Sequence, residues 1–80
     1  MAHDILIIDD EPDIRLLVDG VLRDEGYETR QAADSQAAIA AFRARRPSLV
    51  ILDVWLQGSQ QDGLGILQTL HGEEPHVPVV

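Results

Sequence analysis

Short apolar runs along the chain predict β-strands. Residues 4–8 and 49–52 are almost uninterrupted apolar stretches, a pattern typical of strands that are covered on both faces in a parallel sheet. Residues 27–32 alternate weakly around Thr29 and predict a more polar strand near the edge of the sheet. The last residues, 77–80, have the composition of a fourth strand at its beginning.

Between these strands, apolar residues recur with the period of an α-helix, which predicts three helices. Proline favours the first turn of a helix, aspartate or serine its N-cap, and glycine the position after its end. The first helix is bounded by Pro12 and Gly26, the second covers 37–45 with Asp34 or Ser35 as its N-cap and Pro47 after it, and the third ends near Gly72. The expected apolar faces are Ile14, Leu17, Val18, Val21 and Leu22; Ala38, Ile39, Ala41 and Phe42; and Leu64, Ile66, Leu67 and Leu70.

Strands and helices alternate strictly along the sequence. Such alternation implies right-handed crossovers and an α/β fold with a doubly wound parallel sheet. Eighty residues make at most one domain, and a domain of this size buries little surface. We therefore expect residues 1–80 to be a single domain that is incomplete at its C-terminus, because the last predicted strand is cut off as it begins.

The composition excludes several classes of protein. A net charge of -8 repels phosphate backbones and anionic lipids, so we expect no direct nucleic-acid contact and no membrane binding. No apolar run is long enough to cross a bilayer, and the N-terminus has no secretory signal pattern, which favours a cytoplasmic location. The absence of cysteine leaves oxygen and imidazole as the available metal ligands.

Two of the predicted strands end in carboxylates. Asp9 and Asp10 follow the first strand, and Asp53 follows the third. Parallel strands end at the same edge of a sheet, so these acids are expected to converge where open α/β folds bind ligands. Clustered carboxylates stay ionised when a cation joins them, and oxygen ligands favour Mg²⁺. Mg²⁺ commonly pairs with phosphate, and Asp53 is the candidate nucleophile for a phosphoryl group.

The motifs ILIIDDEPDIRLLV, SLVILDVWLQ and DGLGIL resemble the receiver domain of bacterial two-component response regulators. The resemblance implies a flavodoxin-like sheet of order 2-1-3-4-5. It also implies that Asp53 accepts phosphate from a sensor histidine kinase. Asp10 and Asp53 would bind Mg²⁺ directly, Asp9 through water, and Trp55 through its backbone carbonyl. Receivers are not conventional enzymes, although they catalyse their own phosphorylation and dephosphorylation.

The segment WLQGSQQDGLGIL is most similar to receivers of NtrX type, which belong to nitrogen regulation regulators with a transcriptional output module. Two features depart from the family pattern. Gln57 replaces a common proline, and the loop that leads to Gly63 is two residues longer than usual. The switch Ser or Thr and the Lys of the family would lie beyond Val80. Receivers often dimerise, and an uncovered edge at residues 77–80 would favour self-association.

Two alternatives stay open at the level of sequence. The acids could belong to a receiver-like protein-interaction module that works without phosphorylation, although the joint presence of Asp9, Asp10 and Asp53 favours the phosphoacceptor. A phosphohydrolase with an aspartyl intermediate would need a second acid two residues beyond its nucleophile, where this chain has Trp55. Taken alone, acids before a helix are also typical of a solvated cap that interacts with the helix dipole.

Overall fold

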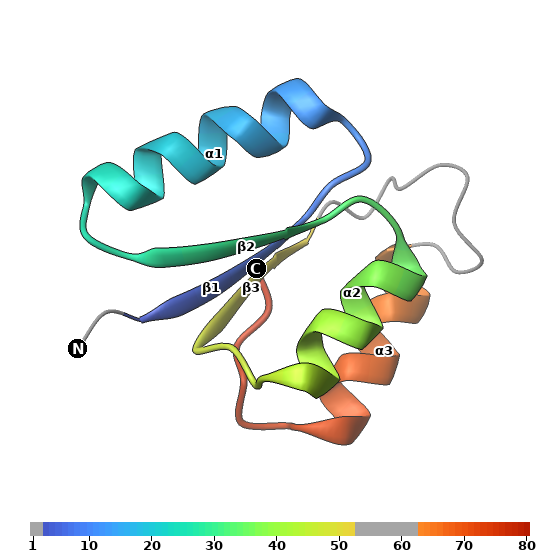
Figure 1. Cartoon of the computed structure of the whole chain (residues 1–80). Coiled ribbons are helices and arrows are strands. Elements are labelled where there is room, and N and C mark those ends of the chain that lie inside the picture. Colours follow the sequence, from blue (N-terminus) through green and yellow to red (C-terminus); the bar gives the residue numbers. More distant parts are fainter. Residues whose placement is uncertain (1–2, 53–62) are drawn as a thin grey trace.

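The described part of the computed structural model is a parallel sheet with helices on both faces (Figure 1). The structure describes residues 3–52 and 63–80. In these residues the strand order is β2-β1-β3, which confirms the predicted α/β class and places the polar strand at an edge. The elements are β1 (Asp4–Ile8), α1 (Pro12–Asp24), β2 (Glu28–Ala32), α2 (Ser35–Ala44), β3 (Leu49–Leu52) and α3 (Gly63–Glu73).

The predicted element boundaries agree closely with the observed ones. Both apolar runs form strands with the predicted bounds, and β1 is buried along its whole length. Asp34 is the N-cap of α2, and its carboxylate accepts a hydrogen bond from the backbone N–H of Ala37 at 2.8 Å. Gly26 follows α1 with a φ of 93°, a conformation that glycine adopts at little cost.

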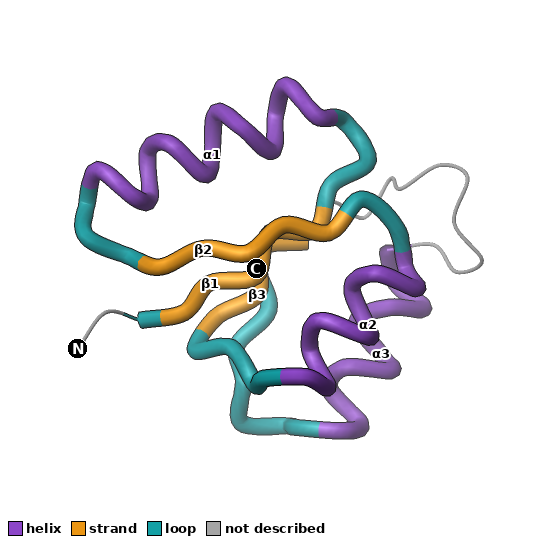
Figure 2. The backbone as a smooth tube through the Cα atoms, viewed as in Figure 1, coloured by secondary structure: helices purple, strands orange, loops and turns teal. Residues whose placement is uncertain are grey.

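The predicted fourth strand is present as one pairing beside β3. Val79 forms a parallel bridge with Val50, and the N–H of Val50 donates to the carbonyl of Pro78 at 2.9 Å. The backbone after α3 therefore returns to the sheet next to β3, on the side away from β1 (Figure 2). This position is the one that the order 2-1-3-4 requires.

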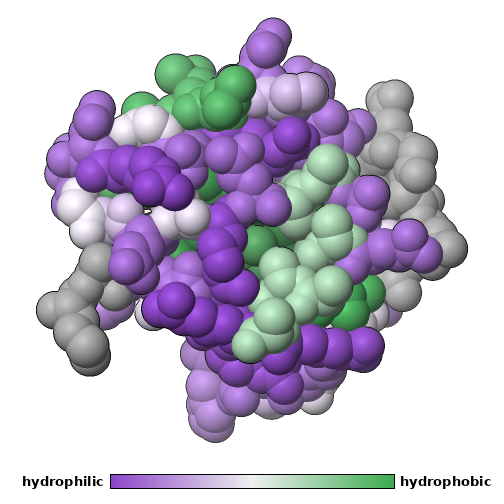
Figure 3. Space-filling view, viewed as in Figure 1, coloured by the Kyte–Doolittle hydropathy of each residue, from purple (hydrophilic) through white to green (hydrophobic). Residues whose placement is uncertain are grey.

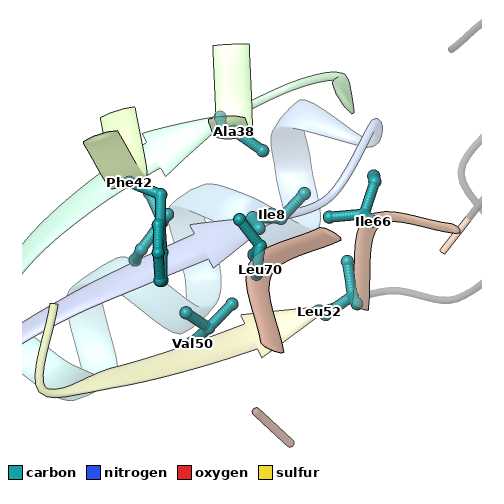
Figure 4. Packing of buried hydrophobic residues seen from close by; sticks show 9 residues of the cluster. Ile8, Ala38, Phe42, Val50, Leu52, Ile66 and Leu70 are labelled. Atoms are coloured by element: carbon teal, nitrogen blue, oxygen red, sulfur yellow. The ribbon is translucent and has the colours of Figure 1, made fainter. Parts of the chain in front are cut away.

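The main core lies between the sheet and the helix pair α2 and α3. Side chains alternate between the faces of a strand, so Leu6 and Ile8 of β1 point to the same side as Val50 and Leu52 of β3, their partners in the parallel register. Phe42 of α2 is fully buried against this face (Figure 4). Among the described residues, the buried members of this cluster are Leu6, Ile8, Ala32, Ala38, Phe42, Val50, Leu52, Ile66 and Leu70.

Of the helices in residues 3–52 and 63–80, only α1 lies on the other face, and it leaves much of its apolar surface exposed. Ile14, Leu17 and Val21 are 42%, 65% and 55% exposed, and Figure 3 shows hydrophobic residues gathered on the outer surface above α1. The stripe of α1 that faces the sheet, which includes Val18 and Leu22, is rotated from these residues by roughly a quarter turn of a helix. The sequence predicted the apolar face of this helix correctly, but only one border of that face contacts the sheet.

Among the described residues, no helix is both long enough and apolar enough to cross a membrane. The three histidines, His3, His71 and His76, are all exposed.

Candidate functional site

Asp9 and Asp10 lie at the carboxyl end of the central strand. They follow β1 directly and are both half-buried. Ile8, the last residue of β1, pairs with Ala32 of β2 on one side and with Leu52 of β3 on the other. The two carboxylates therefore occupy the edge of the sheet at which open parallel folds bind their ligands.

Three hydrogen bonds fix the position of Asp9. Its backbone N–H donates to the carbonyl of Ala32 at 3.1 Å, which extends the pairing between β1 and β2 by one residue. Its side-chain Oδ1 accepts from the backbone N–H of Glu11 at 2.9 Å. Its backbone carbonyl accepts from Nη1 of Arg15 at 2.8 Å. The loop between β1 and α1 is thus held at Asp9 from the strand, from the loop itself and from the helix.

Two of the acids before α1, Asp9 and Glu11, do not cap the helix through their side chains. Glu11 is the N-cap residue of α1, but its side chain makes no capping hydrogen bond. The carboxylate of Asp9 bonds the N–H of the N-cap residue instead of an N–H within the helix. The Asp9 hydrogen bond therefore orders the loop before α1 and does not cap the helix itself.

Arg15 is a part of this site that the sequence analysis missed. Its Nε donates to Oε1 of Gln31 on β2 at 3.2 Å, while its Nη1 reaches the carbonyl of Asp9. One side chain of α1 thereby joins β2 to the end of β1. A signal was present in the sequence, because Arg15 lies on the same helical stripe as Val18 and Leu22, where an apolar residue would be the ordinary choice for a position that faces the sheet.

The predicted residues Asp53 and Trp55 lie outside the described residues, so their convergence with Asp9 and Asp10 stays a prediction. Within residues 3–52 and 63–80, no group of three or more histidines and carboxylates could hold a metal ion. The donors that are described, two neighbouring carboxylates at a half-buried strand end, fit the preference of Mg²⁺ for oxygen and for one or two carboxylates per site. They would supply part of a binding site.

A second polar cluster lies at the opposite, amino edge of the sheet. It surrounds a pocket of about 270 Å³ lined by Asp4, Arg23, Glu28, Thr29, Arg30 and Arg45. The cations there face acids: Arg30 contacts Asp4 at 2.7 Å, and Arg45 contacts Glu28 at 3.4 Å. These charges compensate one another, and nothing in the pocket favours a bound ligand over the existing ion pairs.

Helix α1 makes a second polar contact with β2, at Asp19. The hydroxyl of Thr29 donates to the Asp19 carboxylate, and Arg23 pairs with the same carboxylate at 3.0 Å. The hydrogen bond from Thr29, followed by the charge of Arg23, holds the pKa of Asp19 below its ordinary value of 3.8. Asp19 is thus kept ionised, and it anchors the middle of α1 as Arg15 anchors its beginning.

Comparisons with known proteins agree on one family. Residues 5–80 match the family model described as the response regulator receiver domain. The chain is 60% identical over 80 residues to the nitrogen assimilation regulatory protein NtrX of Azorhizobium caulinodans, and the match covers 100% of this chain and 18% of that protein.

Two solved structures are similar in both fold and sequence. The receiver domain of NtrX from Brucella abortus superimposes with a TM-score of 0.93 at 55% identity, covering 95% of this chain and 63% of that one. The response regulator TrrA of Thermotoga maritima, solved in complex with Mg²⁺-BeF, gives 0.89 at 33% identity, covering 99% and 66%. The chain spans less than two thirds of the length of each of these relatives. The high TM-scores confirm the predicted receiver-type fold.

Proposed function

Because the chain belongs to the family of response regulator receiver domains, we propose that Asp53 accepts a phosphoryl group from a sensor histidine kinase, with Mg²⁺ bound by the neighbouring acids. The chain is similar to NtrX. By that likeness, the phosphorylated form would control a transcriptional output module in nitrogen regulation. The proposal covers an aspartyl switch that acts on itself, and not an enzyme that turns over a separate substrate.

The register of β1 and β3 is the observation that carries the proposal. Ile8 pairs with Leu52 in parallel, and the next residue along each strand is an aspartate, Asp9 or Asp53. Neighbouring strands are separated by about 4.8 Å. Because the chain leaves β1 and β3 at the same level of the sheet and in the same direction, we expect the carboxylates of Asp9 and Asp53 to lie close enough to share one cation.

Asp10 and Asp53 are proposed as direct ligands of Mg²⁺, Asp9 as a ligand through water, and the backbone carbonyl of Trp55 as the remaining protein ligand. Mg²⁺ demands near-octahedral oxygen coordination and retains several waters. When bound, it would neutralise charge on the phosphoryl oxygens. The described carboxylate of Asp9 already accepts one hydrogen bond from the N–H of Glu11, which suits a residue that reaches the metal through water.

In the proposed step, a carboxylate oxygen of Asp53 attacks the phosphorus of a phosphohistidine. The new O–P bond forms as the P–N bond breaks, and the imidazole leaves with the electron pair of that bond. It departs as neutral imidazole when its other ring nitrogen is protonated, and otherwise takes up one proton from solvent. No external oxidant or reductant is needed. Positioning and electrostatic stabilisation account for most of the rate in such transfers.

The proposed partners are the kinase and a second copy of the chain. The exposed apolar residues on α1, among them Leu17 and Val21, support self-association, because apolar surface of this kind is rarely left in water. The net charge of -8 argues against direct contact with nucleic acid by this segment.

The test is phosphorylation by a small phosphodonor, acetyl phosphate, in the presence of Mg²⁺. We expect intact-protein mass spectrometry to show the addition of one phosphoryl group to the natural protein, and no addition to Asp53→Asn. Asp10→Asn should slow the reaction strongly, and chelation of Mg²⁺ should stop it. Asp13→Asn, which removes an exposed acid from the first turn of α1, is the control and should react normally.

The outcome also separates the proposed function from its alternative. A natural protein that folds but gains no phosphoryl group from the donor or from a phosphorylated kinase would favour the phosphorylation-independent interaction module. Phosphorylation that persists in Asp53→Asn would show that another residue is the acceptor.

A further inference from the structure

We propose that Arg15 is a positioning residue for the acidic pair: its guanidinium sets the orientation of the peptide unit that joins Asp9 to Asp10 and thereby tunes the affinity of the site for Mg²⁺. This inference rests on the proposed function, because it assigns a role to Arg15 within that same site.

The contact that carries the inference is the hydrogen bond from Nη1 of Arg15 to the carbonyl oxygen of Asp9, at 2.8 Å. This carbonyl belongs to the peptide bond between Asp9 and Asp10. Because a peptide unit is planar and rigid, holding its oxygen fixes the direction in which the backbone enters Asp10. An error of orientation at this point would move the Asp10 carboxylate, which is a proposed direct ligand.

Arg15 is itself held in place from a second side. Its Nε donates to Oε1 of Gln31 on β2 at 3.2 Å, and its backbone N–H donates to the carbonyl of Glu11 at 3.1 Å. Arginine suits this task because its planar guanidinium carries several donors in a fixed geometry. The hydrogen bond to Asp9 is partly buried, and a charged donor strengthens such a bond.

The location of Arg15 would be unfavourable if the residue had no such role. It follows Pro12 by three residues in the first turn of α1, where the helix dipole disfavours a cation. It also takes a position on the sheet-facing stripe that an apolar residue could fill. The contact with the Asp9 carbonyl and the nearby acids compensate for both costs, which indicates a link to the acidic loop and not only to the sheet.

The chain contains a matched control for a purely structural role. Arg23 also projects from α1 toward β2, donates to the carbonyl of Thr29 at 3.3 Å and pairs with Asp19 at 3.0 Å. It therefore ties α1 to the sheet as Arg15 does, but at the end of the helix that is remote from the acids. Loss of Arg23 should affect stability without affecting the orientation of Asp9 and Asp10.

The experiment compares Arg15→Met, Arg15→Lys and Arg23→Met in the protein at its natural full length. Mg²⁺ affinity is measured by isothermal titration calorimetry with MgCl₂, and stability by urea unfolding without the metal. We expect Arg15→Met to weaken Mg²⁺ binding by roughly tenfold, the lower end of the effect usually seen when a group that orients a metal ligand is removed. Arg15→Lys keeps a charged donor but lacks the planar guanidinium with its several donors, and it should lose less Mg²⁺ affinity than Arg15→Met.

Arg23→Met should bind Mg²⁺ as the natural protein does, whatever it loses in stability. Equal Mg²⁺ affinity in Arg15→Met and the natural protein would overturn the inference, and so would an equal loss in Arg15→Met and Arg23→Met. If Arg15→Met does not fold, Arg15→Lys is compared with Arg23→Met instead. Equal Mg²⁺ affinity in these two variants would then overturn the inference. A natural protein that shows no saturable Mg²⁺ binding would instead overturn the proposed function itself, and this result is distinguishable because it appears before any substitution is made.

Discussion

The guanidinium of Arg30 lies 2.7 Å from the carboxylate of Asp4, and the same guanidinium donates to one carbonyl in the last turn of α2 and to that of its C-cap residue. These carbonyls belong to Ala41 and Arg45, each at 2.7 Å. One side chain of β2 therefore neutralises a buried acid on β1 and gives a second donor to the carbonyl of Ala41, which also accepts the backbone N–H of Arg45. Arg30 fixes α2 at the amino edge of the sheet, as Arg15 fixes the loop at the carboxyl edge.

Arg30→Met should destabilise the fold by about 2–4 kcal/mol, because among the described residues it leaves the buried carboxylate of Asp4 with only the more distant Arg45 as a cation, and it removes one donor from the carbonyls of Ala41 and Arg45. Arg45 lies 3.5 Å from Asp4 and is largely exposed, so it compensates only in part. Urea unfolding measures the change. The double variant Arg30→Met with Asp4→Asn should recover some of the loss, and an unchanged or larger loss in the double variant would contradict this explanation.

Phe42 is the largest fully buried side chain among the described residues, and Phe42→Ala should cost about 3–5 kcal/mol by loss of apolar burial and formation of a cavity. Phe42→Leu should cost much less, since most of the volume is kept. The measurement is chemical denaturation at equilibrium. A small effect of Phe42→Ala would mean that α2 and α3 move together and fill the cavity. The stability of the core would then depend little on Phe42.

Local sequence patterns predicted most of the fold because each element carries its own signal. Residues 49–52 are apolar throughout and flanked by polar residues, so the pattern predicts both the strand and the residues at which it begins and ends. Asp34 ends a loop with an oxygen that can accept a backbone N–H, and it is the N-cap. The local sequence does not indicate how α1 is rotated about its own axis relative to the sheet, because the apolar face of this helix is broader than the stripe that contacts the sheet.

The candidate site was only partly predictable for a similar reason. Carboxylates at strand ends can be recognised from the order of elements, and Asp9 and Asp10 lie where that order places them. The partners of Asp9 cannot be recognised in this way. Arg15 stands out in the sequence as a charge on an apolar stripe, but its bonds to Asp9 and to Gln31, 16 residues away, form only when α1 packs on β2.

Acid should destabilise the protein partly through Asp19. Its pKa is lowered from 3.8, chiefly by the hydrogen bond from Thr29 and then by the charge of Arg23. A group whose pKa is lower in the folded state contributes stability that is fully present above its unfolded pKa and is lost as the pH falls through the folded value. Asp19→Asn should therefore lower stability at neutral pH and reduce the slope of stability against pH below about pH 4.

Unfolding curves in urea at a series of pH values would measure this effect. Thr29→Val removes the main cause of the lowered pKa and should reduce the same slope, while Asp24→Asn, an exposed acid at the end of α1, serves as the control. An acid slope that is identical in Asp19→Asn and the natural protein would show that other carboxylates account for the acid sensitivity.

A charge should affect the stability of the fold much more on the sheet-facing stripe of α1 than on its exposed stripe. Leu17 is 65% exposed, whereas Val18 is half-buried on the stripe that faces the sheet. Leu17→Glu removes apolar surface from water at little cost in folding, and we expect a stability change within about 0.5 kcal/mol, as for other exposed positions. Val18→Glu buries a carboxylate against β1 and β2 and should destabilise the fold by about 2 kcal/mol or more.

If the exposed face of α1 mediates self-association, Leu17→Glu should also shift the 80-residue chain toward the monomer. Sedimentation velocity over a range of concentrations measures this shift, with Gln36→Glu, an exposed change on α2, as a control of equal charge. An unchanged distribution in Leu17→Glu would place any association elsewhere, for example at the edge formed by Val79 and Val80. Since charge and exposure change alike in the two variants, a difference between them isolates the apolar face of α1 as the cause.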